Sequence, residues 1–186
     1  MPISTATMNS QWTLFLDRDG IVNERIVGDY VRRENQFIFR EDFLKTIPVF
    51  RANFGKIIIV TNQQGVAKGL MSEEDVFTVH QYLLNILHDK GIAIDAIYCC
   101  PHLHESGCRC RKPETGMAQQ AQKDFPDIDF QKSLMIGDSL SDILFGKRCG
   151  MMTALVDASL SPLHLDTVAL PDYYVRNLLE LTQLIF

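Results

Sequence analysis

The chain has 186 residues, a length that suits one compact domain with a sizeable core. Its composition is that of an ordinary globular protein, with 46% hydrophobic and 22% charged residues and a formal net charge of -5. This charge, together with the lack of a lysine- and arginine-rich run, argues against nucleic acid as a partner. A small anionic substrate remains compatible, because a local pocket can be positive on a negatively charged protein.

The termini and the apolar runs set the expected compartment. The N-terminal sequence has no basic segment followed by an apolar stretch, as a secretory signal would. Apolar runs such as 57–60 are too short to cross a bilayer. We therefore expect a cytoplasmic protein with no membrane attachment. We also expect a monomer, although nothing in the sequence forbids a dimer. Residues 1–10 are small and polar and are expected to form a flexible tail, followed by a single domain over 11–186.

Strands and helices are predicted to alternate along the chain. The first half contains an apolar strand at 12–16, a mixed loop at 18–40 with a β-rich piece at 37–39, a helix at 42–53, a β-branched strand at 57–60, a helix from Ser72 to Gly91 and a strand at 96–99. The second half contains a Cys/His-rich loop at 100–113, a helix at 115–124, a strand at 133–136, a helix at 141–149, strands at 152–156 and 173–175, and a last helix at 176–185.

This alternation predicts a doubly wound parallel α/β sheet of the Rossmann-like kind. In such sheets ligands bind beyond the carboxyl ends of the strands. Polar residues follow several predicted strands at Asp17, at 61–63 and at Asp138, and Lys112 lies in a loop at the same edge. We expect these groups to form one site.

Asp17 and Asp19 form a carboxylate pair directly after the first strand. Two carboxylates so close together are tolerated when a hard cation such as Mg²⁺ neutralises them. One of them can attack phosphorus, and the other can protonate the leaving oxygen and later deprotonate water. The alternative is a simple turn in which Asp19 and Gly20 make the bend.

Asp138 follows a later strand and is a candidate to complete the Mg²⁺ site, although an aspartate there can also cap a helix. Asp142 is expected to be structural or to act on the metal through water.

Further groups are candidates to bind a phosphoryl group. Thr61, Asn62 and Gln63 offer a hydroxyl and two amides, and Lys112 offers a point charge. Ordinary loop polarity and a solvated lysine are the alternative interpretations.

The loop after residue 99 contains four soft metal ligands within eleven positions, namely Cys100, His102, Cys108 and Cys110. Three thiolates and one imidazole predict a closed, structural Zn²⁺ site that staples the loop. Cys99 and His104 are possible substitute ligands. The loop ends at Arg111 and Lys112, so the metal is expected to fix where these cations point.

The residues described above resemble the haloacid dehalogenase-like phosphatases, which carry four motifs in a fixed order. The segments that resemble these motifs are 15–20, 60–63, Lys112 and 137–142, and the resemblance spans about residues 12–156. Because no large insertion separates the motifs, the resemblance implies a minimal cap. It implies a Mg²⁺-dependent hydrolase in which Asp17 forms an aspartyl-phosphate and Asp19 is the general acid/base, with its backbone carbonyl on Mg²⁺. Thr61 would hold the phosphoryl group together with Lys112, and Asp138 would complete the metal site with Asp17.

Within the family, the segments 17–23, 61–69 and 110–117 are similar to the D-glycero-D-manno-heptose 1,7-bisphosphate phosphatases. The resemblance implies a small phosphorylated carbohydrate as substrate, recognised in part by Arg111, with Asn62 and Gln63 as further substrate-binding residues. Two departures point elsewhere. The five-residue spacing in the zinc loop is similar to that of histidinol-phosphatases, and Ser139 stands where a heptose enzyme typically presents lysine.

Three other functions stay open at this point. The chain is compatible with a histidinol-phosphatase of histidine biosynthesis, which shares the zinc loop and the chemistry. A catalytically inactive, zinc-stapled binding module is another reading, although the full set of carboxylates and Lys112 argues against it. Transfer of the phosphoryl group to an acceptor other than water is the third.

Overall fold

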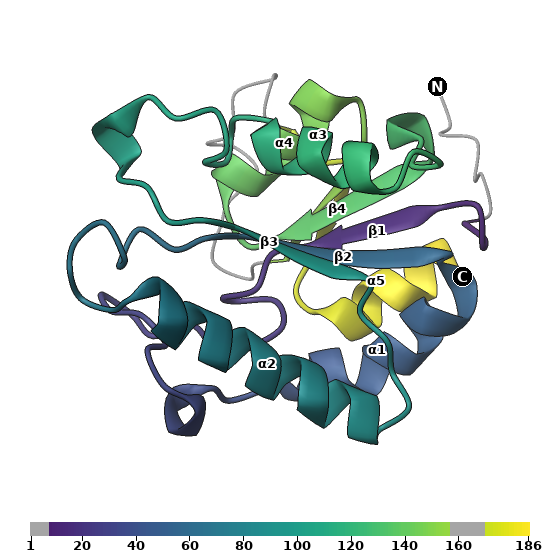
Figure 1. Ribbon diagram of the computed structural model, residues 1–186. Coiled ribbons are helices and arrows are strands. Elements are labelled where there is room, and N and C mark those ends of the chain that lie inside the picture. The colour runs from purple at the N-terminus through teal and green to yellow at the C-terminus, as the bar shows by residue number, and fades with distance from the viewer. Residues whose placement is uncertain (1–7, 157–169) are drawn as a thin grey trace.

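The computed structural model describes residues 8–156 and 170–186 (Figure 1). Its centre is a parallel sheet of six strands in the order β3-β2-β1-β4-β5-β6. The strands are β1 (Thr13–Leu16), β2 (Lys56–Asn62), β3 (Ala96–Cys100), β4 (Ser133–Gly137), β5 (Met152–Val156) and β6 (Tyr173–Val175). Strand order reverses at β1, so the crevice between β1 and β4 is the point where doubly wound sheets bind ligands. The predicted fold class is confirmed.

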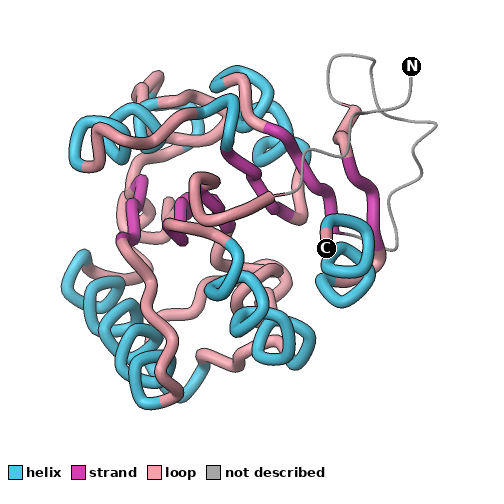
Figure 2. Tube along the Cα trace, turned by 90° about the vertical axis from the view of Figure 1, so that its right-hand side faces the viewer, coloured by secondary structure: helices cyan, strands magenta, loops and turns pink. Residues whose placement is uncertain are grey.

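Helices cover both faces of the sheet (Figures 1 and 2). One layer contains α1 (Glu41–Asn53), α2 (Glu73–Asp89) and α5 (Leu178–Ile185), and the other contains α3 (Gly116–Asp124) and α4 (Leu140–Cys149). Alternate strand residues supply two cores because successive side chains of a strand point to opposite faces. Leu14 and Ile57 belong to the first core, whereas Phe15 and Ile58 belong to the second.

The ends of two helices are fixed by side-chain caps. Ser72 forms a capping box with Asp75 at the start of α2, as the sequence predicts. Helix α4 begins with a second capping box, in which Ser139 is the N-cap and Asp142 is the reciprocal partner. Asp138 is therefore not the helix cap, and its carboxylate is available to the crevice.

The segment between β1 and α1 differs from the expectation. The β-rich piece predicted at 37–39 does not form a strand: the segment has a 3-10 turn at Glu34–Gln36, and Phe39 makes one isolated bridge to Asn23. The aromatic residues there serve packing instead. The Phe37 ring lies 4.9 Å from that of Phe39 and 6.1 Å from that of Tyr82 on α2.

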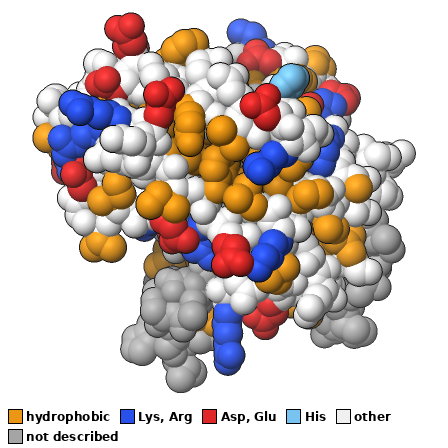
Figure 3. All heavy atoms as spheres, turned by 90° about the horizontal axis from the view of Figure 1, so that it is seen from below, with side chains coloured by type: hydrophobic (Ala, Val, Ile, Leu, Met, Phe, Trp, Pro, Cys, Tyr) orange, Lys and Arg blue, Asp and Glu red, His pale blue; other side chains and the backbone are white. Residues whose placement is uncertain are grey.

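The ends of the described chain complete the picture. Met8, within the predicted tail, is buried against the core, whereas residues 1–7 of that tail lie outside the described residues. Seen from the side of α1, α2 and α5, hydrophobic side chains gather on the surface among charged ones (Figure 3). Within 8–156 and 170–186, every helix lacks the length or the apolar character that a bilayer crossing needs.

Candidate active site

Asp17 is the first residue after β1, at the centre of the sheet. Its backbone N–H donates to the carbonyl of Ile136 on β4 at 2.9 Å, which holds Asp17 at the crevice between β1 and β4. Its Oδ1 accepts from the backbone N–H of Arg18 at 2.8 Å and from Lys112 Nζ at 2.8 Å. Burial, followed by the carboxylate of Asp142, raises the pKa of Asp17 to about 6, although Lys112 opposes the shift.

Lys112 is almost completely buried, and its ammonium group has three partners. Nζ lies 2.8 Å from Asp17, 2.6 Å from Asp142 Oδ1 and 2.8 Å from the carbonyl of Val60. Burial alone would lower the pKa of Lys112, but the two carboxylates raise it, so the lysine is charged. The side chain of Asn62 binds the backbone of Lys112 on both sides. It accepts from the Lys112 N–H at 3.0 Å and donates to the Lys112 carbonyl at 3.1 Å.

Asp19 lies beside Asp17 within a ring of donors. Arg18 donates to it from Nε at 3.3 Å and from Nη2 at 3.0 and 2.9 Å. Asn23 Nδ2 and Gln63 Nε2 donate at 2.9 and 2.7 Å. Burial alone would raise the pKa of Asp19, but Arg18 and the two amides hold it below its usual value. Gln63 is fully buried and is not among the residues that line the cavity.

Asp138 follows β4 and faces the turn after Asp19. A Cβ atom on Gly20, whose φ is +94°, would lie 1.9 Å from Asp138 Oδ2, so the close approach requires glycine at position 20. Arg25 Nη2 donates to Asp138 Oδ1 at 2.6 Å and to the carbonyl of Asp19 at 3.3 Å. Burial, followed by the carboxylate of Asp17, raises the pKa of Asp138 to about 7.

These carboxylates fit a hard divalent cation. One oxygen from each of Asp17, Asp138 and Asp142 lies within 4.8 Å of the others. The raised pKa values of Asp17 and Asp138 show the cost of gathering negative charge in a buried crevice, which a divalent cation removes. The side chain of Asp19 is turned toward Arg18, whereas its carbonyl faces Arg25.

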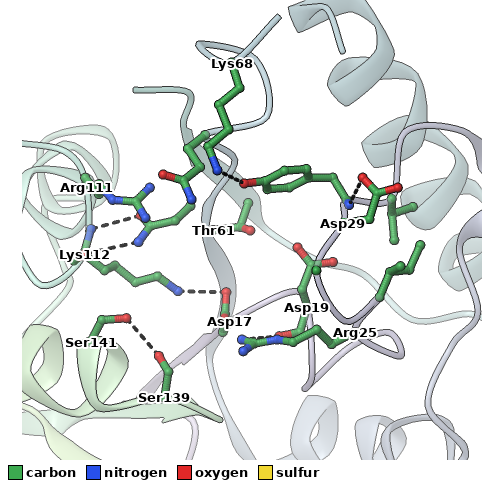
Figure 4. A pocket seen from close by; sticks show the side chains of 16 residues that line it. Asp17, Asp19, Arg25, Asp29, Thr61, Lys68, Arg111, Lys112, Ser139 and Ser141 are labelled. Carbon is green, nitrogen blue, oxygen red and sulfur yellow. Dashed lines mark hydrogen bonds and ion pairs between the residues drawn. The ribbon is translucent and has the colours of Figure 1, made fainter. Parts of the chain in front are cut away.

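A cavity of about 430 Å³ opens over Asp17 and Asp19 (Figure 4). Thr61, Asn62, Arg111 and Lys112 line it, as does the Arg25–Val31 stretch at several positions. Three cationic side chains besides Lys112 stand around the cavity, namely Arg25, Lys68 and Arg111. Lys68 Nζ donates to the hydroxyl of Tyr30 at 3.2 Å.

The four predicted zinc ligands come together after β3. Donor atoms of Cys100, His102, Cys108 and Cys110 all lie within 4.8 Å of one another. Cys110 Sγ lies 3.0 Å from Cys100 Sγ, 3.1 Å from His102 Nδ1 and 3.6 Å from Cys108 Sγ. A tetrahedral zinc with bonds near 2.3 Å needs donor separations of about 3.7 Å. The 3.6 Å separation matches this value, and the two shorter ones must open by about 0.6 Å to admit the ion. Cys99 and His104 are not part of this group.

The loop passes directly into the cavity wall. Arg111 follows Cys110 in the chain, and its Nη1 donates to the carbonyl of His102 at 3.4 Å.

Sequence reasoning missed five residues of this site, namely Arg18, Asn23, Arg25, Lys68 and His80. Arg18 is fully buried and contacts His80 on α2 at 3.0 Å. An arginine inside a carboxylate-rich turn is a signal for such a buried ion pair, but its partner on α2 lies 62 positions away. Only the fold brings the two together.

The chain is similar to known phosphatases in sequence and in fold. A family model described as HAD-hydrolase-like matches residues 109–181. The chain is 44% identical over 133 residues to a D-glycero-alpha-D-manno-heptose-1,7-bisphosphate 7-phosphatase of Mycobacterium tuberculosis, covering 72% of this chain and 70% of that one. It is 34% identical over 179 residues to the D-glycero-beta-D-manno-heptose-1,7-bisphosphate 7-phosphatase of Pasteurella multocida, covering 92% and 95%.

Among solved structures, the D,D-heptose 1,7-bisphosphate phosphatase of B. bronchiseptica, crystallised with magnesium and phosphate, aligns with a TM-score of 0.81. It is 28% identical, and the alignment covers 94% of this chain and 97% of that one.

Proposed function

Because this chain belongs to the haloacid dehalogenase-like phosphatases, we propose that it hydrolyses D-glycero-D-manno-heptose 1,7-bisphosphate through an aspartyl-phosphate on Asp17. Relatives whose sequences align with most of this chain are named for that activity. The observation that carries the choice of a bisphosphate is the set of cations at the cavity. Lys112 pairs with Asp17 and Asp142 beside the transferring phosphoryl group. Arg25, which pairs with Asp138, and Lys68 and Arg111 stand farther along the cavity and provide charge for a second phosphate.

The same cations disfavour histidinol phosphate, which carries a positive amine at neutral pH. Ser139 stands at the position where a heptose enzyme is expected to have lysine. Lys68 and Arg25 nevertheless supply positive charge at the same cavity. The intact arrangement of Asp17, Asp19 and Lys112 also speaks against an inactive binding module. The heptose bisphosphate is therefore the substrate we propose.

The first half of the reaction transfers the phosphoryl group to the enzyme. Oδ1 of Asp17 is held by Lys112 and the Arg18 N–H, which leaves Oδ2 to attack phosphorus. The bond from phosphorus to the sugar oxygen breaks, and that oxygen takes a proton from Asp19. The low pKa of Asp19 means that it is ionised before substrate binds. A bound phosphate raises the pKa of a neighbouring carboxyl group, so Asp19 takes up a proton from solvent as the substrate binds.

The second half returns the enzyme to its starting state. Asp19, now a carboxylate again, takes a proton from a water molecule as the water oxygen attacks phosphorus. The bond between phosphorus and Asp17 breaks, inorganic phosphate leaves, and Asp19 releases its proton to solvent, which restores its ionised resting state. We propose that Thr61 binds the phosphoryl oxygens together with Lys112, since both line the cavity beside Asp17. Asn62 and Gln63 then act by holding Lys112 and Asp19 in place.

We further propose two metals for the resting enzyme. Asp17, Asp138 and the Asp19 carbonyl would hold Mg²⁺, which when bound supplies positive charge to the transferring phosphoryl group. Cys100, His102, Cys108 and Cys110 would hold a structural Zn²⁺. The zinc ligands fix the base of the loop from which Arg111 and Lys112 project, so their role is to aim these cations.

A substrate comparison tests the proposal. Purified enzyme is assayed for phosphate release from both anomers of the heptose bisphosphate and from histidinol phosphate, each with Mg²⁺. We expect turnover of at least one heptose anomer to exceed that of histidinol phosphate by about 100-fold or more. Histidinol phosphate has no second phosphate, so the cations of the cavity would be left without a partner. The variant Asp17→Asn is the control and is expected to be folded and inactive. Preference for histidinol phosphate would contradict the proposal.

A further inference from the structure

Arg18 is the largest side chain that is completely buried in the described chain. A buried guanidinium requires acceptors for its N–H groups, because an unpaired buried donor or charge is costly. Nε and Nη2 donate to Asp19, as described above. Nη1 meets a different partner, Nε2 of His80, at 3.0 Å. The plane of the guanidinium is thus held from two sides, by Asp19 and by His80.

His80 lies in the middle of α2, outside every motif that points to the reaction. Its side chain is almost completely buried. Burial, followed by the positive charge of Arg18, lowers the pKa of His80 to about 3, so the imidazole is neutral. A neutral imidazole that meets an N–H donor at Nε2 carries its own hydrogen on Nδ1. His80 is therefore an acceptor for Arg18.

We propose that His80 is a positioning residue for the general acid/base, which acts by holding Arg18 so that Arg18 aligns the carboxylate of Asp19. The proposal deepens the proposed phosphatase function and rests on it. His80 fixes Nη1, and the guanidinium is rigid and planar, so Nε and Nη2 are fixed as well. The carboxylate that meets them then has one orientation relative to Asp17.

Loss of the acceptor has a defined consequence. With Nη1 unpaired, the guanidinium turns to find another acceptor, and the carboxylate of Asp19 keeps only its contacts with Asn23 and Gln63 and loses its alignment. Proton donation to the leaving oxygen is then slowed, although Asp17, Lys112 and the cavity are unchanged. Substrate binding is expected to persist, so kcat falls while KM stays near its starting value.

The experiment compares leaving groups in three variants. His80→Leu removes the acceptor, His80→Gln restores one with an amide oxygen at a similar reach, and His88→Leu is the matched control on the exposed side of α2. Values of kcat/KM are measured for heptose bisphosphate, whose leaving alkoxide needs a proton, and for 4-nitrophenyl phosphate, whose leaving group needs none. The ratio of the two kcat/KM values, sugar phosphate over 4-nitrophenyl phosphate, reports the first half of the reaction alone.

For His80→Leu we expect kcat/KM on the sugar phosphate to fall by about 10-fold or more, with a fall of less than about 3-fold on 4-nitrophenyl phosphate. His80→Gln and His88→Leu should retain the ratio of the unaltered enzyme. Equal losses on both substrates, or no loss on either, would overturn the proposal, as would a folded His80→Gln that behaves like the leucine variant. If His80→Leu does not fold, His80→Asn, which is polar but too short to reach Arg18, replaces it.

A second readout needs no substrate. Nitrogen-15 NMR of the Arg18 guanidinium should show separate, slowly exchanging Nη signals in the unaltered protein and in His80→Gln, and merged signals in His80→Leu. Unchanged Arg18 signals in His80→Leu would overturn the positioning role even if no phosphate ester were hydrolysed. Failure of the unaltered enzyme on heptose bisphosphate would instead count against the proposed function, so the two failures are distinguishable.

Discussion

Replacement of Lys112 by methionine is expected to damage both stability and catalysis, because one buried cation serves two buried carboxylates. Its ammonium lies 2.8 Å from Asp17 and 2.6 Å from Asp142. Breaking a single buried ion pair typically costs 3–5 kcal/mol, so a loss of about 4–5 kcal/mol is expected near pH 8. Loss of the charge that faces the phosphoryl group should lower kcat by about 10³-fold.

The pH dependence of this loss follows from the carboxylates that Lys112 leaves behind. Without the lysine the pKa of Asp17 rises above about 6, its value with the lysine present. A group whose pKa is raised on folding favours the folded state at low pH and disfavours it as the pH rises through that pKa. The stability deficit of Lys112→Met is therefore largest above about pH 7 and shrinks as the pH falls below about 6.

Urea denaturation of the metal-free protein at several pH values measures the deficit, and phosphate release measures kcat. Lys147→Met is the control, since Lys147 lies 2.7 Å from Asp172 but both side chains are close to one third exposed. That pair should be worth at most about 1 kcal/mol. Equal stability of the two variants near pH 8, or normal turnover by Lys112→Met, would contradict the proposed role of the buried lysine.

Four further outcomes are expected. Because the pKa of Asp138 is about 7 in the metal-free protein, calorimetric Mg²⁺ affinity should weaken as the pH falls from about 8 to about 5, and a constant affinity would contradict this. Gly20→Ala should abolish Mg²⁺ binding, since its Cβ would lie 1.9 Å from Asp138 Oδ2, whereas Gly91→Ala, with φ +72° and open space, should cost only about 1 kcal/mol of stability. Arg25→Ala should bind Mg²⁺ more tightly, because Arg25 contacts two of the proposed ligand oxygens, and should raise KM for the bisphosphate; unchanged affinity would count against the shared site. Elemental analysis should find about one zinc per chain and almost none in Cys110→Ser, and a well-folded, zinc-free unaltered protein would disprove the zinc site.

The parts of the fold that the sequence predicts are those set by local pattern. The unbroken β-branched run at 57–60 is the interior of β2, which pairs with β1 and β3. Ser72 caps the start of α2, and the sequence predicts this because the cap is an interaction between residues close together in the chain. The placement of Asp17 and Asp138 at one edge follows from parallel topology, since both directly follow neighbouring strands.

The parts that it does not predict depend on contacts between distant segments. Arginine is ordinarily expected at the surface. Arg18 is buried only because His80 and Asp19 accept hydrogen bonds from its N–H groups. The sequence predicts Asn62 and Gln63 as substrate-binding residues from their place after β2. In the structure their side chains contact Lys112 and Asp19, and Asn62 lines the cavity whereas Gln63 does not. Only the folded structure distinguishes amides that hold the catalytic groups from amides that face a substrate.

The central claim is that Asp17 carries the phosphoryl group during turnover. The direct test is to mix the enzyme with Mg²⁺ and heptose bisphosphate, quench with acid within the first turnover, and map the modified peptide by mass spectrometry. We predict one phosphoryl group on the peptide that contains Asp17, at the aspartate itself, and none in Asp17→Asn. Normal turnover by Asp17→Asn, or a phosphoryl group on a different residue, would contradict the account.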